Sequence, residues 1–238
     1  PAGKEAAEPA APEPEESLED LMAELDGLCG LERVKKDVKS LINLVKVRKL
    51  REKEGLPTPP LSLHLVFMGN PGTGKTTVAR LLARIYHAIG VLSKGQLVEV
   101  DRSGLVAGFV GQTAIKTGEA VQKALGGVLF IDEAYALSNH DSPNDFGQEA
   151  IETLLKGMED HREDLVVIVA GYTDLMERFL HSNPGLESRF NKYFYFEDYD
   201  GAQLMEIFLS LCEKNGYALQ KEGEEAVRAW FQRLYAER

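Results

Sequence analysis

Apolar residues recur every three or four positions in several segments of the chain, a spacing that places them on one side of a helix. A helical pattern of this kind begins at Leu18, includes a stripe from Leu31 to Val45, and is expected to end near Gly55. Further stripes lie between residues 78 and 89 and between 151 and 158. The pattern therefore predicts amphipathic helices that cover an apolar layer.

Short continuous apolar runs separate these helices and have the length of buried strands. The expected strands are 63–68, 97–100, 127–131, 165–170 and 193–196. Because parallel neighbours need crossover connections, this alternation predicts a parallel sheet with helices on both faces. After about residue 199 only helical patterns remain, so a small helical subdomain is expected there.

Acidic residues outnumber basic ones along the chain, at 38 against 27, which gives a net charge of −11. This balance disfavours a protein that mainly coats nucleic acid or an anionic membrane, since both need clustered lysine and arginine. No apolar run approaches the length of a membrane span, and no signal peptide pattern is present. A cytoplasmic protein is therefore expected.

The N-terminal segment and the two cysteines carry no recognisable chemistry. Residues 1–16 hold four prolines, five alanines and five glutamates without a large apolar side chain, which is typical of a disordered linker. Cys29 and Cys212 stand alone without the spacing of a zinc site. They are expected to be buried small hydrophobes.

The strongest chemical signal is the segment from Gly69 to Thr76, which matches the pattern GxxxxGK[ST] between a strand-like and a helix-like run. Such a loop wraps backbone N–H groups around phosphates at a helix N-terminus. Lys75 is expected to reach the β- and γ-phosphates of ATP, and the Thr76 hydroxyl to ligate Mg²⁺. The predicted ATP-binding residues of the loop are Gly69, Asn70, Pro71, Gly72, Thr73, Gly74, Lys75, Thr76 and Thr77.

The third expected strand, at 127–131, ends in Asp132 and Glu133. Asp132 is expected to hold the Mg²⁺, and Glu133 to polarise the attacking water one residue further out. The alternative is an acidic pair that only caps the end of a strand. The phosphate-binding loop favours the catalytic interpretation.

Four motifs occur in order: 69–76, Gly-Gly-Val-Leu-Phe-Ile-Asp-Glu-Ala-Tyr at 126–135, Ala-Gly-Tyr at 170–172 and Ser-Asn-Pro-Gly-Leu-Glu-Ser-Arg-Phe at 182–190. Together they resemble the AAA+ ATPases of the CbbX/CfxQ family. Segments 91–95, 145–149 and 188–190 look closest to its stage V sporulation protein K branch. The resemblance implies an α/β P-loop fold with a parallel five-stranded sheet in the order 5-1-4-3-2.

The resemblance also implies how the chain is divided. Residues 1–16 are then a linker, 17–199 the large nucleotide-binding domain, and 200–238 the start of a truncated helical lid. The lid arginine of the family lies in a segment beyond the last helix of this sequence, which ends at Arg238. The chain is therefore expected to bind nucleotide well and to hydrolyse it poorly.

ATP would lie between adjacent subunits of a hexameric ring in a protein of this family. Arg189 matches the arginine finger that enters the neighbouring site, with an ordinary surface ion pair as its alternative role and Arg178 as a weaker candidate. Gly30 and Leu31 match the segment whose backbone contacts adenine, although they could simply start a helix.

Two further family features have partial matches. Tyr172 aligns best with the sensor 1 position and Thr173 is next; either hydroxyl could orient the attacking water, or the tyrosine could simply pack at the strand end. Phe109, Val110 and Gly111 match the pore loop that grips a polypeptide in the channel of the ring. A core phenylalanine under a loop is the alternative for Phe109.

The function expected from these features is that of an ATP-hydrolysing motor that forms a ring and remodels or threads a protein partner of unknown identity. The alternatives are a non-motor regulatory NTPase switch, a P-loop kinase and a nucleic-acid loader or motor, the last disfavoured by the acidic balance. A GTPase is disfavoured because residues 191–194 lack the Asp of the guanine-reading NKxD motif.

Overall fold

A computed structural model describes residues 16–109, 111–138 and 146–236. Within these ranges the strands form one parallel sheet with the spatial order β2-β3-β4-β1-β5, which confirms the predicted order. The strands are β1 (Leu65–Gly69), β2 (Leu97–Val100), β3 (Val128–Ile131), β4 (Val166–Gly171) and β5 (Tyr193–Phe196). The five predicted strands are thus all present, with boundaries that differ by at most two residues.

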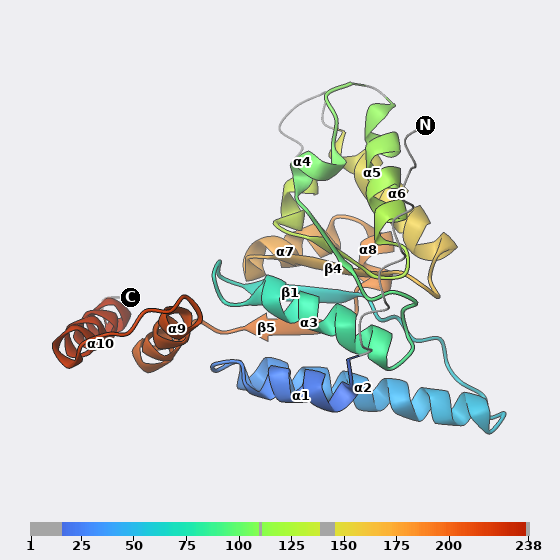
Figure 1. The fold of residues 1–238 in the computed structure, drawn as a ribbon. Coiled ribbons are helices and arrows are strands. Elements are labelled where there is room, and N and C mark those ends of the chain that lie inside the picture. Colours follow the sequence, from blue (N-terminus) through green and yellow to red (C-terminus); the bar gives the residue numbers. More distant parts are fainter. Residues whose placement is uncertain (1–15, 110, 139–145, 237–238) are drawn as a thin grey trace, which may run out of the picture.

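Helices connect successive strands and cover the sheet (Figure 1). They are α1 (Leu18–Asp26), α2 (Glu32–Lys53), α3 (Lys75–Ala88), α4 (Arg102–Leu105), α5 (Gln112–Ala124), the 3-10 helix η1 (Ala134–Ser138), α6 (Gly147–Asp160), α7 (Thr173–His181), α8 (Pro184–Arg189), α9 (Gly201–Lys214) and α10 (Lys221–Ala236).

Alternate residues of each strand point to opposite faces, so one sheet supplies two apolar cores. Leu65 and Phe67 of β1 belong to the core under α1, α2 and α3. Val66 and Met68 belong to the core under α5, α6, α7 and α8. Both faces of the sheet are therefore covered, as the continuous apolar strands predict.

The helical pattern that begins at Leu18 forms two helices instead of one. Gly30 and Leu31, between α1 and α2, have φ values of 61° and 58°, which a right-handed helix does not allow. The expectation of one continuous helix from Leu18 is therefore wrong, although Leu31 is the N-cap of α2 and packs against the same core as the apolar stripe of that helix. The predicted end near Gly55 is confirmed, because α2 ends at Lys53.

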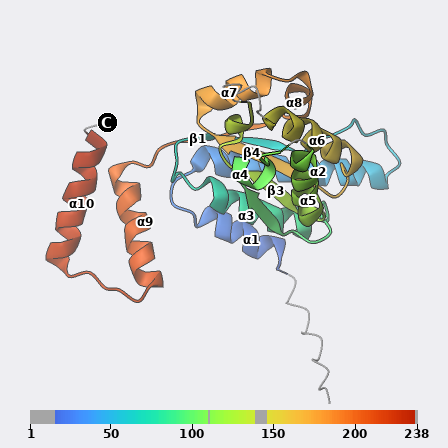
Figure 2. The ribbon, with the colours of Figure 1, turned by 90° about the horizontal axis from the view of Figure 1, so that it is seen from above.

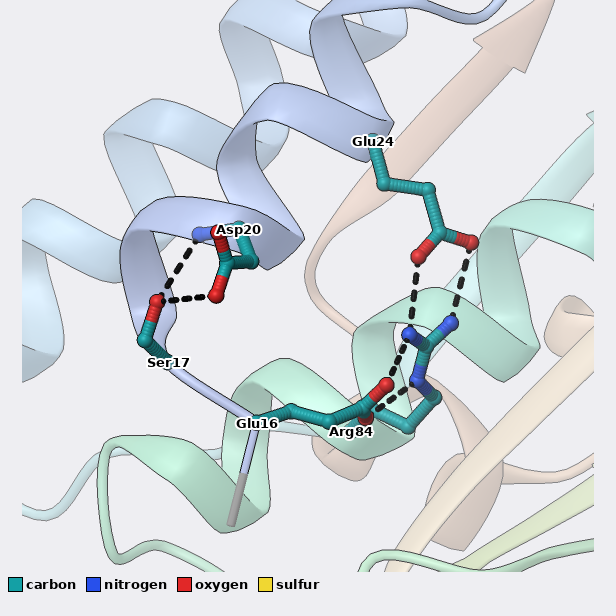
Figure 3. Close-up of polar contacts among 5 residues, drawn as sticks. All are labelled: Glu16, Ser17, Asp20, Glu24 and Arg84. Atoms are coloured by element: carbon teal, nitrogen blue, oxygen red, sulfur yellow. Dashed lines mark hydrogen bonds and ion pairs between the residues drawn. The ribbon is translucent and has the colours of Figure 1, made fainter. Parts of the chain in front are cut away.

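The start of α1 is held by polar contacts that Figure 3 shows. The Ser17 hydroxyl accepts a hydrogen bond from the backbone N–H of Asp20. The Arg84 guanidinium of α3 donates to Glu16 at 2.7 Å and to Glu24 at 2.9 Å. Glu16 is thus part of the folded molecule, which corrects the predicted linker at its last residue; residues 1–15 lie outside the described ranges.

The last two helices pack on each other beyond β5, to one side of the sheet (Figures 1 and 2). A capping box formed by Asp200 and Gln203 starts α9. Met205 of α9 is buried, whereas no residue of α10 is, and Trp230 is 55% exposed. The helices are those that the sequence predicts, but the apolar stripe of α10 is only partly covered: the Phe231 ring lies 6.1 Å from that of Phe208 in α9, whereas Trp230, Leu234 and Tyr235 are exposed.

The structure also tests two smaller expectations, on the cysteines and on membrane-spanning helices. Cys29 and Cys212 are half-buried, so the expectation of fully buried small hydrophobes is wrong. Cys29 lies where the turn before α2 approaches α9, which leaves one side of the thiol open. Within the part of the chain that the structure describes, no helix is both long and apolar enough to cross a membrane.

Candidate nucleotide site

The phosphate-binding loop connects the end of β1 to the start of α3 at the carboxyl edge of the sheet. Gly69 ends the strand with φ 153°, and a side chain there would place its Cβ 2.4 Å from the carbonyl oxygen of Phe196. Gly74, with φ 91°, is the N-cap of α3. Glycine is therefore required at both positions. The loop between them lies at the N-terminus of α3, whose backbone N–H groups can bind phosphate.

A cavity of about 330 Å³ opens at this edge and collects residues from three strand ends. The loop and α3 contribute one wall, Asp132 and Glu133 follow β3, and Tyr172 follows β4. Its lining residues are Gly69, Pro71, Gly72, Gly74, Lys75, Thr76, Thr77, Asp132, Glu133, Gly171 and Tyr172. The structure thus brings together motifs that are 57 and about 100 residues apart in the sequence.

Lys75 places its ammonium group inside this cavity with only 8% of the residue exposed. Nζ donates hydrogen bonds to the carbonyl oxygens of Gly69 at 3.0 Å and Asn70 at 2.7 Å. Burial lowers the pKa of Lys75, and the negative charges of Asp132, Asp198 and Glu133 oppose that shift. A phosphate can replace the carbonyl partners and satisfy the same ammonium group.

Glu133 has an unusual backbone for a residue with a side chain, with φ 48°. Its N–H donates to Oδ1 of Asp132 at 3.0 Å, which ties the two acids into one turn. Non-glycine residues in this region cost roughly 1 kcal/mol or more and cluster at functional sites. The turn holds Asp132 and Glu133 next to each other at the carboxyl end of β3.

Tyr135 and Tyr172 lie close to the acidic pair. The rings of Tyr135 and Tyr172 are 6.2 Å apart, and a Cβ on Gly171 would meet the Tyr135 ring at 2.7 Å. Burial, followed by the nearby charge of Glu133, raises the pKa of Tyr135 to about 12. Of the two sensor 1 candidates only Tyr172 lines the cavity, whereas Thr173 starts α7 and does not.

Two residues of the loop do not line the cavity but support it. The Asn70 amide donates to both carboxylate oxygens of Asp198 at 3.0 Å, and the Thr73 hydroxyl donates to the Asn70 carbonyl oxygen at 2.7 Å. The Tyr199 hydroxyl donates to the carbonyl oxygen of Thr73 at 3.2 Å. Asn70 and Thr73 therefore help to hold the shape of the loop, and their direct contact with ATP stays a prediction.

Asp198 and Tyr199 were missed by the sequence analysis. They follow β5, and the carboxyl ends of parallel strands meet at the same edge of a sheet. That rule, applied to the fifth predicted strand, would have placed both residues beside the loop. They also connect the loop to α9, which begins at Gly201.

The predicted adenine segment lies next to the loop without lining the cavity. A Cβ on Gly74 would stand 3.5 Å from Cδ1 of Leu31, and a Cβ on Gly30 would meet the Gln203 amide at 2.7 Å. The segment is thus placed between the phosphate-binding loop and α9. Contact with adenine stays a prediction.

Arg189 lies away from the cavity, at the amino edge of the sheet. Nη2 pairs with Glu159 at 3.1 Å, and the backbone oxygen of Arg189 accepts from the Ser62 hydroxyl at 2.7 Å. The predicted alternative, an ion pair within the chain, is therefore present. Arg178 does not line the cavity either; it lines a separate surface depression with other residues of α7.

The proposed pore loop is on the surface between α4 and α5. Phe109 is 72% exposed, which excludes the alternative of a core phenylalanine. Gly111 has φ 79° and is the N-cap of α5, while Val110 lies outside the described residues. The exposed ring is free to contact another molecule.

The predicted Mg²⁺ ligands fit that ion. Thr76 and Asp132 both line the cavity and offer a hydroxyl and a carboxylate oxygen. Mg²⁺ is commonly bound by one or two protein oxygens together with substrate phosphates and water. Glu99 adds a carboxylate oxygen 3.5 Å from the Thr76 hydroxyl.

Comparison with known proteins agrees with a nucleotide site of the P-loop type. Residues 65–198 match the family model of the ATPases associated with various cellular activities, AAA. Protein CfxQ of Xanthobacter flavus is 46% identical over 217 residues, which are 91% of this chain and 68% of that protein. Stage V sporulation protein K of Bacillus subtilis is 44% identical over 207 residues, 87% of this chain and 64% of that protein.

A chloroplastic ribulose bisphosphate carboxylase/oxygenase activase of Cyanidioschyzon merolae is 45% identical over 219 residues, which are 92% of this chain and 74% of that protein. The family resemblance that the motifs carry is therefore confirmed. Identities of 44 to 46% are too similar to separate the sporulation branch from the others.

Proposed function

This chain belongs to the AAA family of ATPases, and on that premise we propose that it hydrolyses ATP, assembles into a ring and remodels or threads a protein partner. The observation that carries the proposal is the separation of the cavity from Arg189. The cavity lies at the carboxyl edge of the sheet and Arg189 at the amino edge. A complete site therefore needs two copies of the chain.

The groups in the cavity match the chemistry of ATP hydrolysis. The N-terminus of α3 and the Lys75 ammonium bind phosphate oxygens, while Glu133 accepts the proton of the attacking water. The Tyr172 hydroxyl orients that water. Bound at Thr76 and Asp132, Mg²⁺ supplies positive charge for the phosphate oxygens.

The missing component is a second positive charge. Among the described residues that line the cavity, none is an arginine. A head-to-tail contact would bring Arg189 of one copy to the cavity of the next, and repetition of that contact closes a ring. An arginine supplied in this way is worth about 10³ to 10⁵ in rate in other P-loop enzymes. The family likeness favours a hexamer.

A protein partner is supported by the exposed ring of Phe109 and by the relative whose name states that it activates an enzyme. Phe109→Ala should keep ATP turnover and lose remodelling of the client. Equal loss of both activities would contradict the pore-loop role.

The decisive experiment mixes two inactive variants of the full chain. Glu133→Gln removes the base but keeps the arginine, and Arg189→Ala does the reverse, so each alone should lose at least about 100-fold in turnover. In randomly mixed rings about one quarter of the sites combine an intact Glu133 with an intact Arg189 from the neighbour. The mixture should therefore recover up to about a quarter of wild-type turnover.

The matched control mixes Glu133→Gln with Lys75→Ala. Both changes damage the same cavity, so no combination of subunits restores a complete site and turnover should stay at background. If the first mixture also stays at background while wild-type turnover per subunit is independent of concentration, each subunit acts alone. The function of a non-motor regulatory NTPase switch would then be favoured over that of a ring-forming motor.

A further inference from the structure

The guanidinium of Arg189 is held by contacts from two helices of its own chain. Nη2 pairs with Oε2 of Glu159 in α6 at 3.1 Å, and Nη1 donates to the carbonyl oxygen of Gly185 in α8 at 3.4 Å. The Arg189 side chain is 30% exposed, so most of it is covered while part of it reaches the surface. Arg189 therefore has a defined orientation within a single chain.

The backbone at Arg189 is fixed as well. The Ser62 hydroxyl donates to the carbonyl oxygen of Arg189 at 2.7 Å, and the next residue, Phe190, is fully buried. At the other end of α8, the Asn183 side chain caps the helix by accepting from the N–H of Gly185. The direction of the guanidinium then depends on its side-chain contacts, in which Glu159 is the charged partner.

Glu159 lies in the last turn of α6, on the face that contacts α8 (Figure 2). Leu155, one turn earlier, touches α8, because a Cβ on Gly185 would meet its Cδ1 at 2.7 Å. Since α6 ends just before β4 begins, its last turn lies at the amino edge of the sheet, together with Arg189. Glu159 does not line the cavity of its own chain.

A carboxylate beside an arginine finger could cancel its charge, but a second arginine balances this one. Arg162 lies 4.0 Å from Oε1 of Glu159, whereas Arg189 binds Oε2. The three side chains together keep a net positive charge, and Arg162 is 71% exposed. The group therefore remains attractive to phosphate oxygens.

The strength of the contact suits a positioning role and not a lock. Glu159 is 60% exposed, and exposed ion pairs are weak because water solvates both partners, so the pair cannot withhold Arg189 from a phosphate. A guanidinium has five N–H donors, and these two contacts leave others available. Holding a long side chain in one orientation in advance, by contrast, saves an entropic cost equivalent to about 3- to 10-fold in rate.

We propose that Glu159 is a positioning residue for ATP hydrolysis, which orients the Arg189 guanidinium toward the cavity of the neighbouring copy. The proposal rests on the shared site of the proposed function and adds to it a residue that touches neither nucleotide nor attacking water. Glu159 thus serves the site that its chain completes in the neighbour, and not the cavity of its own chain.

Turnover of the full chain at saturating ATP tests this role. Glu159→Ala removes the carboxylate and should lower turnover per subunit about 3- to 10-fold. The cavity itself is intact, so the loss should appear in kcat while the affinity for ATP stays unchanged. Glu159→Gln keeps an acceptor oxygen at the same reach and should remain within about 2-fold of wild type.

The matched control is Asp160→Ala, which removes the same charge from the next position of α6. The Asp160 side chain is exposed and has no ion pair with another described residue, so turnover should be unchanged. A second comparison uses Arg189→Ala. The double variant Glu159→Ala/Arg189→Ala should be no slower than Arg189→Ala alone, because Glu159 acts through that guanidinium.

Mixed rings show on which site Glu159 acts. Glu159→Ala is combined in equal amounts with Glu133→Gln, which keeps both Glu159 and Arg189. About half of the intact Glu133 bases then receive a well-positioned Arg189 from the neighbour, so turnover per intact base should rise to about half to two thirds of wild type. An effect confined to the cavity of the same chain would leave it at the level of Glu159→Ala alone.

The possible outcomes separate the two proposals. If the mixture of Glu133→Gln and Arg189→Ala recovers no turnover, the shared site and the role of Glu159 both fail. If it recovers while Glu159→Ala turns over as fast as wild type or faster, only the role of Glu159 fails. A loss in Glu159→Ala that persists in the Arg189→Ala background would not pass through the guanidinium, and would also overturn the positioning role.

Discussion

The α/β body and the hairpin of α9 and α10 are built from similar amphipathic helices but differ in what covers them. In the body, apolar residues such as Val38, Ile85 and Leu154 are fully buried against the sheet. In the hairpin, Leu211, Tyr217 and Trp230 are all more than half exposed. The difference shows that an apolar stripe only identifies the side of a helix that is suited to burial. Whether that side is buried depends on which other elements pack against it.

The two regions meet at the candidate site. The segment after β5 gives Asp198 and Tyr199 to the phosphate-binding loop and then starts α9. A rearrangement of the loop on nucleotide binding would therefore act on the base of the hairpin. A tightly packed body beside a loosely packed hairpin favours movement of the hairpin, because few buried contacts oppose it.

The largest expected effect that separates the regions is Phe67→Ala in β1. Phe67 is fully buried and its ring stacks on Phe194 at 5.5 Å and contacts Phe196 at 4.8 Å. Removing the ring leaves a cavity and should lower the free energy of unfolding by about 3 to 5 kcal/mol, measured by urea denaturation. Phe67→Leu, which keeps most of the volume, should cost clearly less. A loss below 1 kcal/mol would show that this core can collapse around the gap.

An intermediate effect is expected from acid, because the body buries a histidine. Burial, together with the charges of Arg189 and Lys192, lowers the pKa of His64 to about 4 from an ordinary value near 6.5. Between these values the unfolded chain binds more protons than the folded one, so stability is lost as the pH falls from 6.5 to 4. The loss attributable to His64 should reach about 3 kcal/mol.

Urea denaturation at pH 7, 5.5 and 4.5 measures this loss. His64 accepts a hydrogen bond from the N–H of Val167 at 3.0 Å, so His64→Phe should be less stable than the wild type at pH 7, where the histidine is neutral in the folded chain. The informative quantity is the slope with pH, which should be shallower in the variant by the contribution of one proton. A variant with the wild-type slope would place the acid sensitivity outside His64.

The smallest effect is expected in the hairpin. Trp230 is 55% exposed, and its ring lies 5.2 Å from that of Phe231 on the same helix. Trp230→Ala should change the free energy of unfolding by less than about 0.5 kcal/mol, in the same denaturation assay. A loss above 2 kcal/mol would show that the face of α10 is covered in solution, and the contrast between the two regions would disappear.

Much of the body and of the site could be predicted because the signals are local. The strands are continuous apolar runs, and the loop at 69–76 carries its chemistry in consecutive residues. The order of the strands was predicted from the family that these motifs resemble, and the structure confirms it. Asp132 and Glu133 reach the cavity because the strand before them ends at the same edge as β1.

Other features depend on contacts between distant segments. The break between α1 and α2 was missed, because Leu31 fits the helical spacing while the fold places its side chain against Gly74. The positive φ of Glu133 and the contact of Asn70 with Asp198 have no local signature. These contacts give Asn70 a structural part in addition to the ligand role that the motif predicts.

The sequence by itself determined the five strands, several of the helices, the phosphate-binding loop and the acidic pair, because residue spacing and backbone preference act within a few positions of the chain. Only the tertiary structure decided which stripes are buried, that Tyr172 and not Thr173 faces the cavity, and that Arg189 lies at the other end of the sheet. Burial and distance are properties of packed neighbours. They exist only once segments far apart in the sequence meet.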